Sequence, residues 1–146
     1  MPTENEPVSI LFVVALFLGF SVVFSGFWCG VVFLVSRMSG WSALATVYAA
    51  RDGVAPSRFR GRTAYLRLGT RYTGTLNFDA DATGFRVAPM VLFRPGHETL
   101  LIPWSDVTTE DSRLMLFSMT RLRFAKCDVP MYLRPRFAQE LLSARR

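Results

Sequence analysis

"VSILFVVALFLGFSVVFSGFWCGVVFLVS", Val8 to Ser36, decides the class of this protein, because the run contains no charged residue. A helix needs about 20 apolar residues to cross the hydrocarbon core of a bilayer, so this run is long enough to span it with some tilt. Core helices of soluble domains are usually shorter and carry a polar face. The sequence therefore predicts a transmembrane helix over residues 8–36 of the 146-residue chain.

A cleaved signal peptide is the alternative interpretation of the same run. Signal peptides begin with positive charge, and their apolar core has about 7–15 residues. Residues 1–7, "MPTENEP", carry two glutamates and no Lys or Arg, and the apolar run that follows them is much longer than such a core. We therefore expect a short N-terminal tail over residues 1–7 and an anchor that is not cleaved.

The charges on either side of the run predict its orientation. Glu4 and Glu6 precede it, whereas all 17 Lys and Arg residues follow it, together with the remaining nine of the 11 acidic residues. Lys and Arg close to a span stay on the cytoplasmic side, and Arg37 comes directly after the run. We expect a single-pass protein with its N-terminus outside and its C-terminal domain in the cytoplasm.

Small residues recur within the predicted span. Gly26 and Gly30 form a G-x-x-x-G pair, and Ser21, Ser25 and Cys29 form a neighbouring stripe at a spacing of four. Small residues on one face of a membrane helix allow a second helix to approach closely. The pattern is consistent with a homodimer or with docking to a larger membrane complex. The alternative is that Gly and Ser are simply common in membrane helices.

A short helix and a basic linker are predicted over residues 37–62. Trp41 and Tyr48 lie at helical spacing, between Ser39 as a candidate N-cap and Gly53 as a candidate end. Their rings are suited either to the membrane interface or to packing on the folded domain.

Arginines in this linker and on one later strand are candidates for contact with anionic lipid headgroups or other phosphates. Cationic residues near an anionic leaflet are attracted to it, although a solvated cluster that only sets the orientation is the alternative. The candidates are Arg37, Arg58, Arg60, Arg62, Arg121 and Arg123.

Residues 63–146 show the pattern of a small β domain. In "TAYLRLGTRYTGTLNF", Thr63 to Phe78, apolar residues at even positions alternate with polar residues at odd positions, as in strands with one solvated face. In "TLLIPW", the side chains of Leu100, Ile102 and Trp104 are predicted to face the core. Pro103 cannot donate a ladder hydrogen bond, so it should lie at a sheet edge or near the end of its strand.

The last third of the chain completes the domain. We expect "SDVTTEDS", residues 105–112, to be a polar connection and residues 113–129 to form two further strands or one long bent strand. Residues 134–146 are predicted to form a C-terminal helix, with Pro135 in its first turn. The fold class is therefore a membrane-anchored α+β protein, with one N-terminal transmembrane helix and a small, curved, mostly antiparallel sheet or partial barrel of six or seven strands.

Several of these residues resemble a known pattern. It runs through Trp41-x2-Leu44-x3-Tyr48, Tyr72-x-Gly74-x-Leu76, Gly84-Phe85 and Phe93-Arg94-x2-His97, and it ends in the segment Leu101-Ile102-Pro103-Trp104-Ser105-Asp106-Val107. This resembles small bacterial single-span membrane proteins with a pleckstrin-homology-like (PH-like) or GRAM-like cytoplasmic domain. The resemblance implies a PH-like fold, an inner-membrane location and packing of Trp41 and Tyr48 on the domain. It implies no activity and no ligand residues.

No set of residues predicts catalysis. His97 is the single histidine, and a general base needs a nucleophile or a metal beside it. Ser105, Asp106 and Cys127 have no spacing that brings them to it. We expect His97 to be a turn or sheet-edge residue that bonds a neighbouring backbone group, so that His97→Ala has little effect. The protein is predicted not to be an enzyme.

Metal and cofactor binding are not predicted either. Cys29 and Cys127 are isolated from each other, and two cysteines with one histidine do not make a zinc site. Asp79 and Asp81 in "DADATG" lack the further ligands of a calcium loop, and turn formation explains both. We therefore expect no cofactor, no metal and no catalytic residue.

The partner classes follow from charge and placement. A sequence pI of about 10.1 suggests nucleic acid, but aromatic residues do not interleave with Arg121 and Arg123 on their strand face, so we do not expect nucleic-acid binding. The leading hypothesis is a non-enzymatic scaffold or adaptor that binds a protein partner or anionic lipid headgroups at the cytoplasmic face. The alternative is a small accessory subunit of a larger membrane complex, docked through the transmembrane helix.

Overall fold

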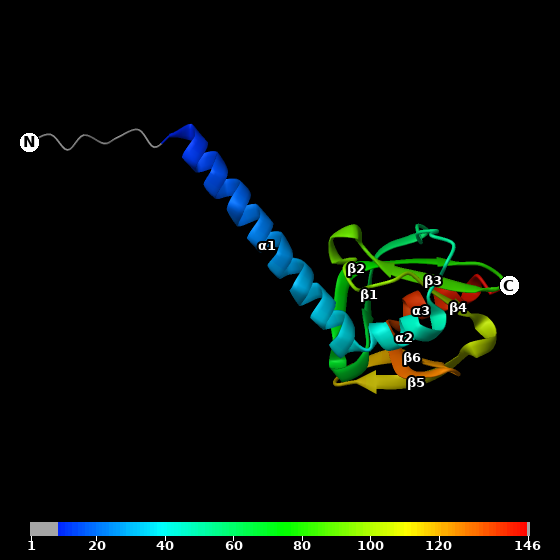
Figure 1. Ribbon diagram of the computed structural model, residues 1–146. Helices are drawn as coiled ribbons and strands as arrows, with labels where there is room; N and C mark the ends of the chain where they lie inside the picture. The colour runs from blue at the N-terminus through cyan, green and yellow to red at the C-terminus, as the bar shows by residue number, and fades with distance from the viewer. Residues whose placement is uncertain (1–8, 146) are drawn as a thin grey trace, which may run out of the picture. The chain divides into compact units, whose positions relative to one another are not determined.

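One long helix and one β domain make up the computed structural model, which describes residues 9–145 (Figure 1). For Leu68 it describes the backbone alone, and the predicted tail over residues 1–7 lies outside the described residues. The chain divides into two compact units between Val31 and Val32. Helix α1, Ile10–Ser39, is continuous through this division.

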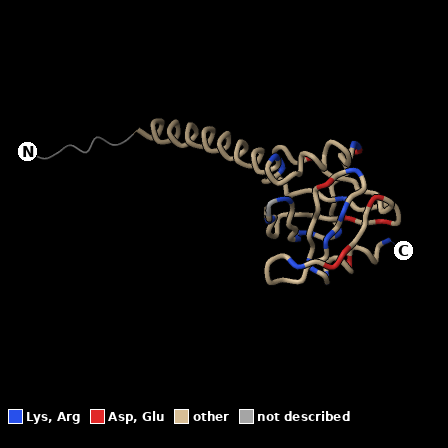
Figure 2. Tube along the Cα trace, turned by 90° about the horizontal axis from the view of Figure 1, so that it is seen from below, with Lys and Arg blue, Asp and Glu red and all other residues tan. Residues whose placement is uncertain are grey.

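Before Val32, α1 is an exposed apolar helix that is long and apolar enough to cross a membrane. Its side chains point outward in all directions, as shown by Leu11 at 80% exposure and Phe27 at 68%. Figure 2 shows α1 without Lys, Arg, Asp or Glu until its last turn, where Arg37 lies. The coarse prediction of an apolar N-terminal helix is confirmed, and the helix extends beyond residue 36.

The last two turns of α1 belong to the β domain, since Val32, Ser36 and Ser39 are buried. Gly40 follows with φ 85°, a left-handed conformation that glycine adopts at little cost. A side chain at Gly40 would meet Val129, because an added Cβ would lie 2.8 Å from Val129 Cγ2. Helix α2, Trp41–Tyr48, begins directly after this turn.

Two expectations about α2 were wrong. Ser39 is the last residue of α1 and Gly40 is the N-cap of α2, because the chain changes direction one residue later than the capping pattern predicted. The helix ends at Tyr48 rather than at Gly53, because Ala49 turns to extended backbone and forms a bridge with Leu100.

Seven antiparallel strands form the sheet, in the order β4-β3-β2-β1-β7-β6-β5. Strand β1 lies in the middle and joins two groups of strands, although it meets β7 at only one register pair, Tyr65 with Tyr132. The strands are β1 Phe59–Tyr65, β2 Arg71–Ala80, β3 Gly84–Pro89, β4 Leu100–Pro103, β5 Val107–Leu114, β6 Phe117–Phe124 and β7 Cys127–Leu133. The prediction of six or seven mostly antiparallel strands is confirmed.

Two helices pack against the sheet and contribute to its core. Helix α2 packs against β4 and β7, and the C-terminal helix α3, Pro135–Ser143, packs against β6. The ring of Phe137 in α3 meets the ring of Phe78 edge to face, with centroids 5.0 Å apart. Such aromatic contacts add to the hydrophobic gain of burial. The predicted C-terminal helix with proline in its first turn is confirmed.

The predicted core face of residues 100–104 is also confirmed. Leu100 and Ile102 are fully buried, Trp104 is 4% exposed, and the Trp104 indole N–H donates to the Asp81 carbonyl at 2.7 Å. Pro103 ends β4, which is an edge strand, so its missing N–H costs no ladder bond. Trp41 and Tyr48 are buried on the domain, as the resemblance implied.

Two other segments differ from the sequence predictions. Most of "SDVTTEDS" lies in β5 and is not a connection, because an edge strand exposed to solvent tolerates polar residues on both faces. The period-two pattern of residues 63–78 is interrupted by a 3₁₀ turn, η1 Arg67–Gly69, which allows β1 to fold back onto β2.

Candidate functional site

An exposed apolar hairpin tip is the most unusual surface feature of the β domain. Leu114 of β5 pairs with Phe117 of β6, so Met115 and Leu116 form a two-residue turn. Met115 is 90% exposed, Leu116 is 95% exposed and Phe117 is 71% exposed. We call Met115, Leu116 and Phe117 the hairpin tip. Single exposed apolar residues are common, but three consecutive ones indicate a surface that contacts something else.

The backbone at the hairpin tip adopts a conformation that its residue does not favour. Met115 has φ 55°, in the left-handed region. Two-residue hairpin turns favour positive φ and usually contain Asn or Gly there, whereas a side chain such as that of Met costs roughly 1–2 kcal/mol. Neither the turn nor the domain core therefore explains why methionine occupies this position.

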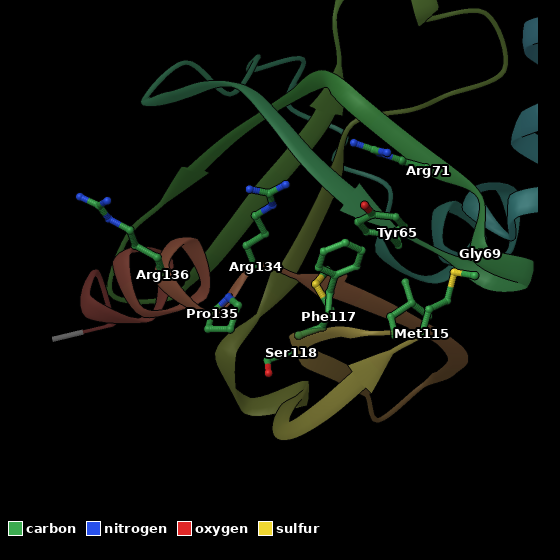
Figure 3. Close-up of a pocket in the computed structure, with 11 residues that line it drawn as sticks. Tyr65, Gly69, Arg71, Met115, Phe117, Ser118, Arg134, Pro135 and Arg136 are labelled. Atoms are coloured by element: carbon green, nitrogen blue, oxygen red, sulfur yellow. The ribbon is translucent and has the colours of Figure 1, made fainter.

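A cavity of about 750 Å³ lies beside the hairpin tip. Its apolar lining comes from β1, from the β5–β6 hairpin and from the start of α3. Figure 3 shows the Phe117 ring pointing toward Tyr65, with Arg71 and Arg134 beside them, whereas Arg136 points away. The apolar lining residues are Tyr65, Leu114, Met115, Phe117, Met119 and Pro135.

The rim of this cavity is cationic. Arg71, Arg134 and Arg136 line it, and no Asp or Glu does. The Arg71 guanidinium lies 5.6 Å from the centroid of the Tyr65 ring. Arg136 is near Glu140, but at 3.9 Å and with 94% exposure of its side chain this is a weak pair. Among residues 9–145, Arg71 and Arg134 form no ion pair, so both guanidinium groups are available to an anionic ligand.

A buried polar network lies on the other side of the start of β2. The Ser39 and Tyr72 hydroxyls are 2.8 Å apart, and the Tyr72 hydroxyl is 2.9 Å from His97 Nε2. His97 Nδ1 is 3.0 Å from the Pro95 carbonyl. The Trp41 ring packs against the rings of both Tyr72 and His97, with centroids 5.6 and 5.2 Å away.

The direction of these hydrogen bonds follows from the Pro95 carbonyl, which can only accept. His97 Nδ1 therefore carries the proton, so Nε2 of the neutral ring accepts from the Tyr72 hydroxyl. Burial lowers the pKa of His97, which favours this neutral ring, and burial likewise raises the pKa of Tyr72. We call Ser39, Tyr72 and His97 the buried network.

The buried network links the end of α1 to β2 and to the segment before β4, and its side chains are almost inaccessible to solvent. Its three residues are exposed by 0%, 6% and 3%, and each polar group has a partner. His97 does bond a neighbouring backbone carbonyl, as predicted. The expectation that His97→Ala has little effect stays a prediction, and the burial of the ring and its bond to Tyr72 argue against it.

Asp106 of the I-P-W-S-D-V segment also has a structural role. Its carboxylate accepts from the Tyr48 hydroxyl at 3.1 Å and pairs with Lys126 Nζ at 3.0 Å. The hydrogen bond from Lys126 lowers the pKa of Asp106 below its usual range. These contacts tie α2 to the turn between β6 and β7, which explains why a distinctive segment need not be a site.

The small residues predicted for helix association all lie on the exposed part of α1. The Ser21 hydroxyl donates to the Phe17 carbonyl at 2.8 Å, and the Ser25 hydroxyl donates to the Ser21 carbonyl at 2.7 Å. Cβ atoms added at Gly26 and Gly30 would meet no atom within 4 Å. Cys29 is also exposed. Association through this face stays a prediction.

The predicted phosphate-contacting arginines are mostly engaged within the domain. The Arg62 guanidinium lies 4.8 Å from the Phe137 ring centroid and 3.5 Å from Glu140. Arg58 Nη1 donates to the Ala80 carbonyl at 3.3 Å. Arg60 is exposed, which leaves it as the solvated member of the linker cluster.

The other three candidate arginines also contact side chains of the chain itself. Arg37 lies over the Phe33 ring at 5.4 Å, and Arg121 lies over the Tyr132 ring at 5.8 Å. Arg123 pairs with Glu110 at 3.2 Å. None of the six candidates lines the cavity beside the hairpin tip.

Sequence reasoning missed both the hairpin tip and its arginines. The signal was the run Leu114 to Phe117, four apolar residues in a segment whose neighbours alternate. Consecutive apolar residues fit neither the one-sided strand pattern nor a polar turn. Arg71, Arg134 and Arg136 were not identifiable, because only the fold brings residues so far apart in the chain to one cavity.

Within the described part of the chain, no three His, Cys, Asp or Glu side chains gather to hold a metal ion. The absence of metal, cofactor and catalysis therefore stays a prediction. A scan against protein-family models finds no match, and searches of curated proteins and of solved structures find no similar chain.

Proposed function

We propose that this protein is a membrane-anchored, non-catalytic module. Helix α1 spans a bacterial inner membrane, and a PH-like domain at the cytoplasmic face serves as a scaffold or adaptor for anionic lipid headgroups or a protein partner. The observation that carries the proposal is the change along α1 at Val32, from a helix exposed on all sides to one with a buried face at Val32, Ser36 and Ser39.

The exposed part of α1 supports the membrane assignment on energetic grounds. Apolar surface in water is unfavourable by about 25 cal/mol per Å², and exposed apolar patches larger than a few hundred Å² indicate a membrane or partner surface. The segment before Val32 exposes large apolar residues on every side of the helix, as the consecutive residues Leu16, Phe17 and Leu18 show. A bilayer covers all sides of a helix at once, whereas a single partner protein covers one.

The buried end of α1 supports the scaffold role. The Ser36 hydroxyl donates to the Gly96 carbonyl, and Ser39 joins the buried network. Gly96 has φ 70°, and a Cβ there would lie 2.5 Å from an atom of the Phe33 ring, so the helix end is closely packed. A flexible linker would leave a domain free to move, whereas these contacts hold the helix end in the domain.

The strand order supports a PH-like domain. The resemblance implied a small, curved antiparallel sheet closed by a C-terminal helix, and the order β4-β3-β2-β1-β7-β6-β5 followed by α3 is consistent with that arrangement. Since one fold carries many functions, the fold argues for a binding module only together with its surface.

Extraction and topology experiments test this proposal. The full chain, expressed in bacteria, is expected to remain in the membrane pellet after alkaline carbonate washing. A fluorescent protein fused to its C-terminus should fluoresce, because that reporter folds in the cytoplasm. Release by carbonate, or activity of a C-terminal alkaline phosphatase instead of fluorescence, would contradict the proposal.

A second candidate function is an accessory subunit docked through α1. It is favoured by the open space at Gly26 and Gly30, where a neighbouring helix has room to approach. Replacing both glycines with isoleucine is expected to abolish co-purification of a membrane partner or of a second, differently tagged copy. Gly19→Ile is the matched control, since Gly19 is equally open but lies outside the pair. Equal co-purification of all three proteins would remove the candidate.

A further inference from the structure

We propose that the hairpin tip and its cavity bind the surface of an anionic phospholipid bilayer. Met115, Leu116 and Phe117 insert among the lipid chains at the interface, and Arg71 and Arg134 hold lipid phosphates. This inference rests on the proposed function, because it assigns the lipid contact of the anchored domain to a defined site.

The exposure of the hairpin tip is the first support. Leu116 and Met115 are more exposed than Leu11 of α1, which is itself a residue of the apolar helix. Met115 holds a left-handed backbone that glycine would adopt more easily. Met115 adds no stability to the domain from this strained, exposed position. A ligand outside the domain explains why an apolar residue is there.

The chemistry of the cavity is the second support. Tyr65, Phe117 and Met119 form apolar walls, and Arg71 and Arg134 stand at the rim without any acidic residue. An anionic phospholipid carries a phosphate directly next to its apolar chains, and guanidinium groups bind phosphate oxygens through paired hydrogen bonds. A purely apolar ligand would leave the arginines unused, and a free phosphate would leave the tip exposed.

The position of the cavity within the domain is the third support. Arg71, which lines the cavity, and Tyr72, which bonds Ser39 in the last turn of α1, are consecutive residues at the start of β2. The cavity and the end of α1 therefore adjoin the same end of one strand. This puts the cavity at the end of the domain that contains the last turn of α1.

A fluorescent label that senses lipid tests the proposal in the full chain. Leu116→Cys, made in a chain with Cys29→Ser and Cys127→Ser, is labelled with NBD and reconstituted into vesicles. The vesicles contain phosphatidylcholine alone or mixed with phosphatidylglycerol, with and without a doxyl lipid that quenches NBD inside the bilayer. Ala82→Cys is the matched control, because Ala82 is exposed in the turn at the opposite end of β2.

The expected result is strong quenching by the doxyl lipid at position 116, weak quenching at position 82, and more quenching at 116 when phosphatidylglycerol is present. Arg71→Gln and Arg134→Gln should each reduce the phosphatidylglycerol-dependent inserted population by about fivefold, the change expected for one cationic contact with an anionic surface. Arg123→Gln is the control for net charge, because Arg123 pairs with Glu110 and does not line the cavity. Circular dichroism checks that each variant is folded.

Three results would overturn the inference in distinguishable ways. Absence of quenching at position 116 in every vesicle, with the chain still floating with the vesicles, would reject lipid insertion and leave the anchor intact. A blue shift at 116 without lipid quenching would show that protein, from a second copy or a partner, covers the tip. A chain that does not float with vesicles would reject the proposed function, and the inference with it.

Discussion

The buried network and the hairpin tip lie on two sides of the start of β2, and each has the burial that is usual for the other's residue type. Ser39, Tyr72 and His97 are polar and almost fully buried, whereas Met115 and Leu116 are apolar and almost fully exposed. Burial of the network is explained within the domain, because every polar group has a partner. Exposure of the tip has no such internal explanation, and this difference is the reason for the proposal that the tip contacts lipid.

The largest expected effect is on the side of the buried network. Trp41→Ala should lower the free energy of unfolding by roughly 3–5 kcal/mol, because the ring is fully buried and packs on Tyr72 and His97. Urea unfolding of the full chain in detergent, followed by circular dichroism, measures it. Leu116→Ala is the control at the tip and should change stability by less than about 0.5 kcal/mol. Equal losses in both variants would break the comparison.

Removing one hydroxyl from the network should have the next largest effect. Tyr72→Phe keeps the ring but leaves His97 Nε2 and the Ser39 hydroxyl without their shared partner. An unsatisfied buried polar group costs about 1–3 kcal/mol, so the unfolding free energy should fall by that amount in the same urea experiment. Tyr65→Phe serves as a control, since the Tyr65 side chain lines the open cavity. A loss of unfolding free energy no greater than that of Tyr65→Phe would show that water takes the place of the Tyr72 hydroxyl.

A smaller effect is expected from pH. Burial holds the pKa of His97 in the folded domain below the ordinary value of 6.5, so the unfolded chain binds a proton at a higher pH than the folded one. Stability is therefore complete above about pH 6.5 and declines as the pH falls from there toward the folded pKa. Thermal unfolding between about pH 7.5 and pH 5 checks this.

The matched variant for the pH experiment is His97→Gln. The chain has no other histidine, and the pKa values of Asp52, Asp81 and Asp106 are lowered, which keeps those carboxylates ionised in this window. The variant should be less stable at neutral pH and should lose the slope between pH 6.5 and pH 5. A slope that persists in His97→Gln would assign the pH dependence to other groups.

The smallest expected change is at the hairpin tip. Met115→Gly should leave the domain as stable or stabilise it by up to about 1 kcal/mol, because glycine relieves the left-handed strain but loses more chain entropy on folding. The same variant should weaken quenching of the label at position 116 by lipid. Clear destabilisation would mean that Met115 supports the fold, and the contrast with the buried network would then be weaker.

Local patterns predicted much of the fold because they depend on neighbours in the chain. The uncharged run predicted α1, alternation predicted most of the strands, and Pro135 marked the start of α3. The predictions failed where tertiary contacts overrule local preference. Polar residues form β5 because the strand lies at a sheet edge. Ser39 ends α1, and its hydroxyl contacts Tyr72 at 2.8 Å while accepting from the Trp41 N–H at only 3.4 Å, so Gly40 is the N-cap of α2.

The candidate site could be predicted only in part. The apolar run from Leu114 to Phe117 was visible in the sequence, and its two-residue turn follows from the register of β5 and β6. The arginines named from their clustering in the sequence proved to be engaged elsewhere, as Arg62 with Glu140 and Arg123 with Glu110. Sequence spacing reports charge density along the chain, whereas a binding site depends on which charges lack a partner.

Length, charge and periodicity are properties of the chain alone, and they are sufficient to predict a long apolar helix followed by a basic, mainly β domain. Tertiary packing, in contrast, buries one face of the last turns of α1, encloses the single histidine and brings Arg71 and Arg134 to an apolar tip. These juxtapositions depend on the order in which β1, β2, β6 and α3 pack, and that order is set by the sum of contacts across the whole core.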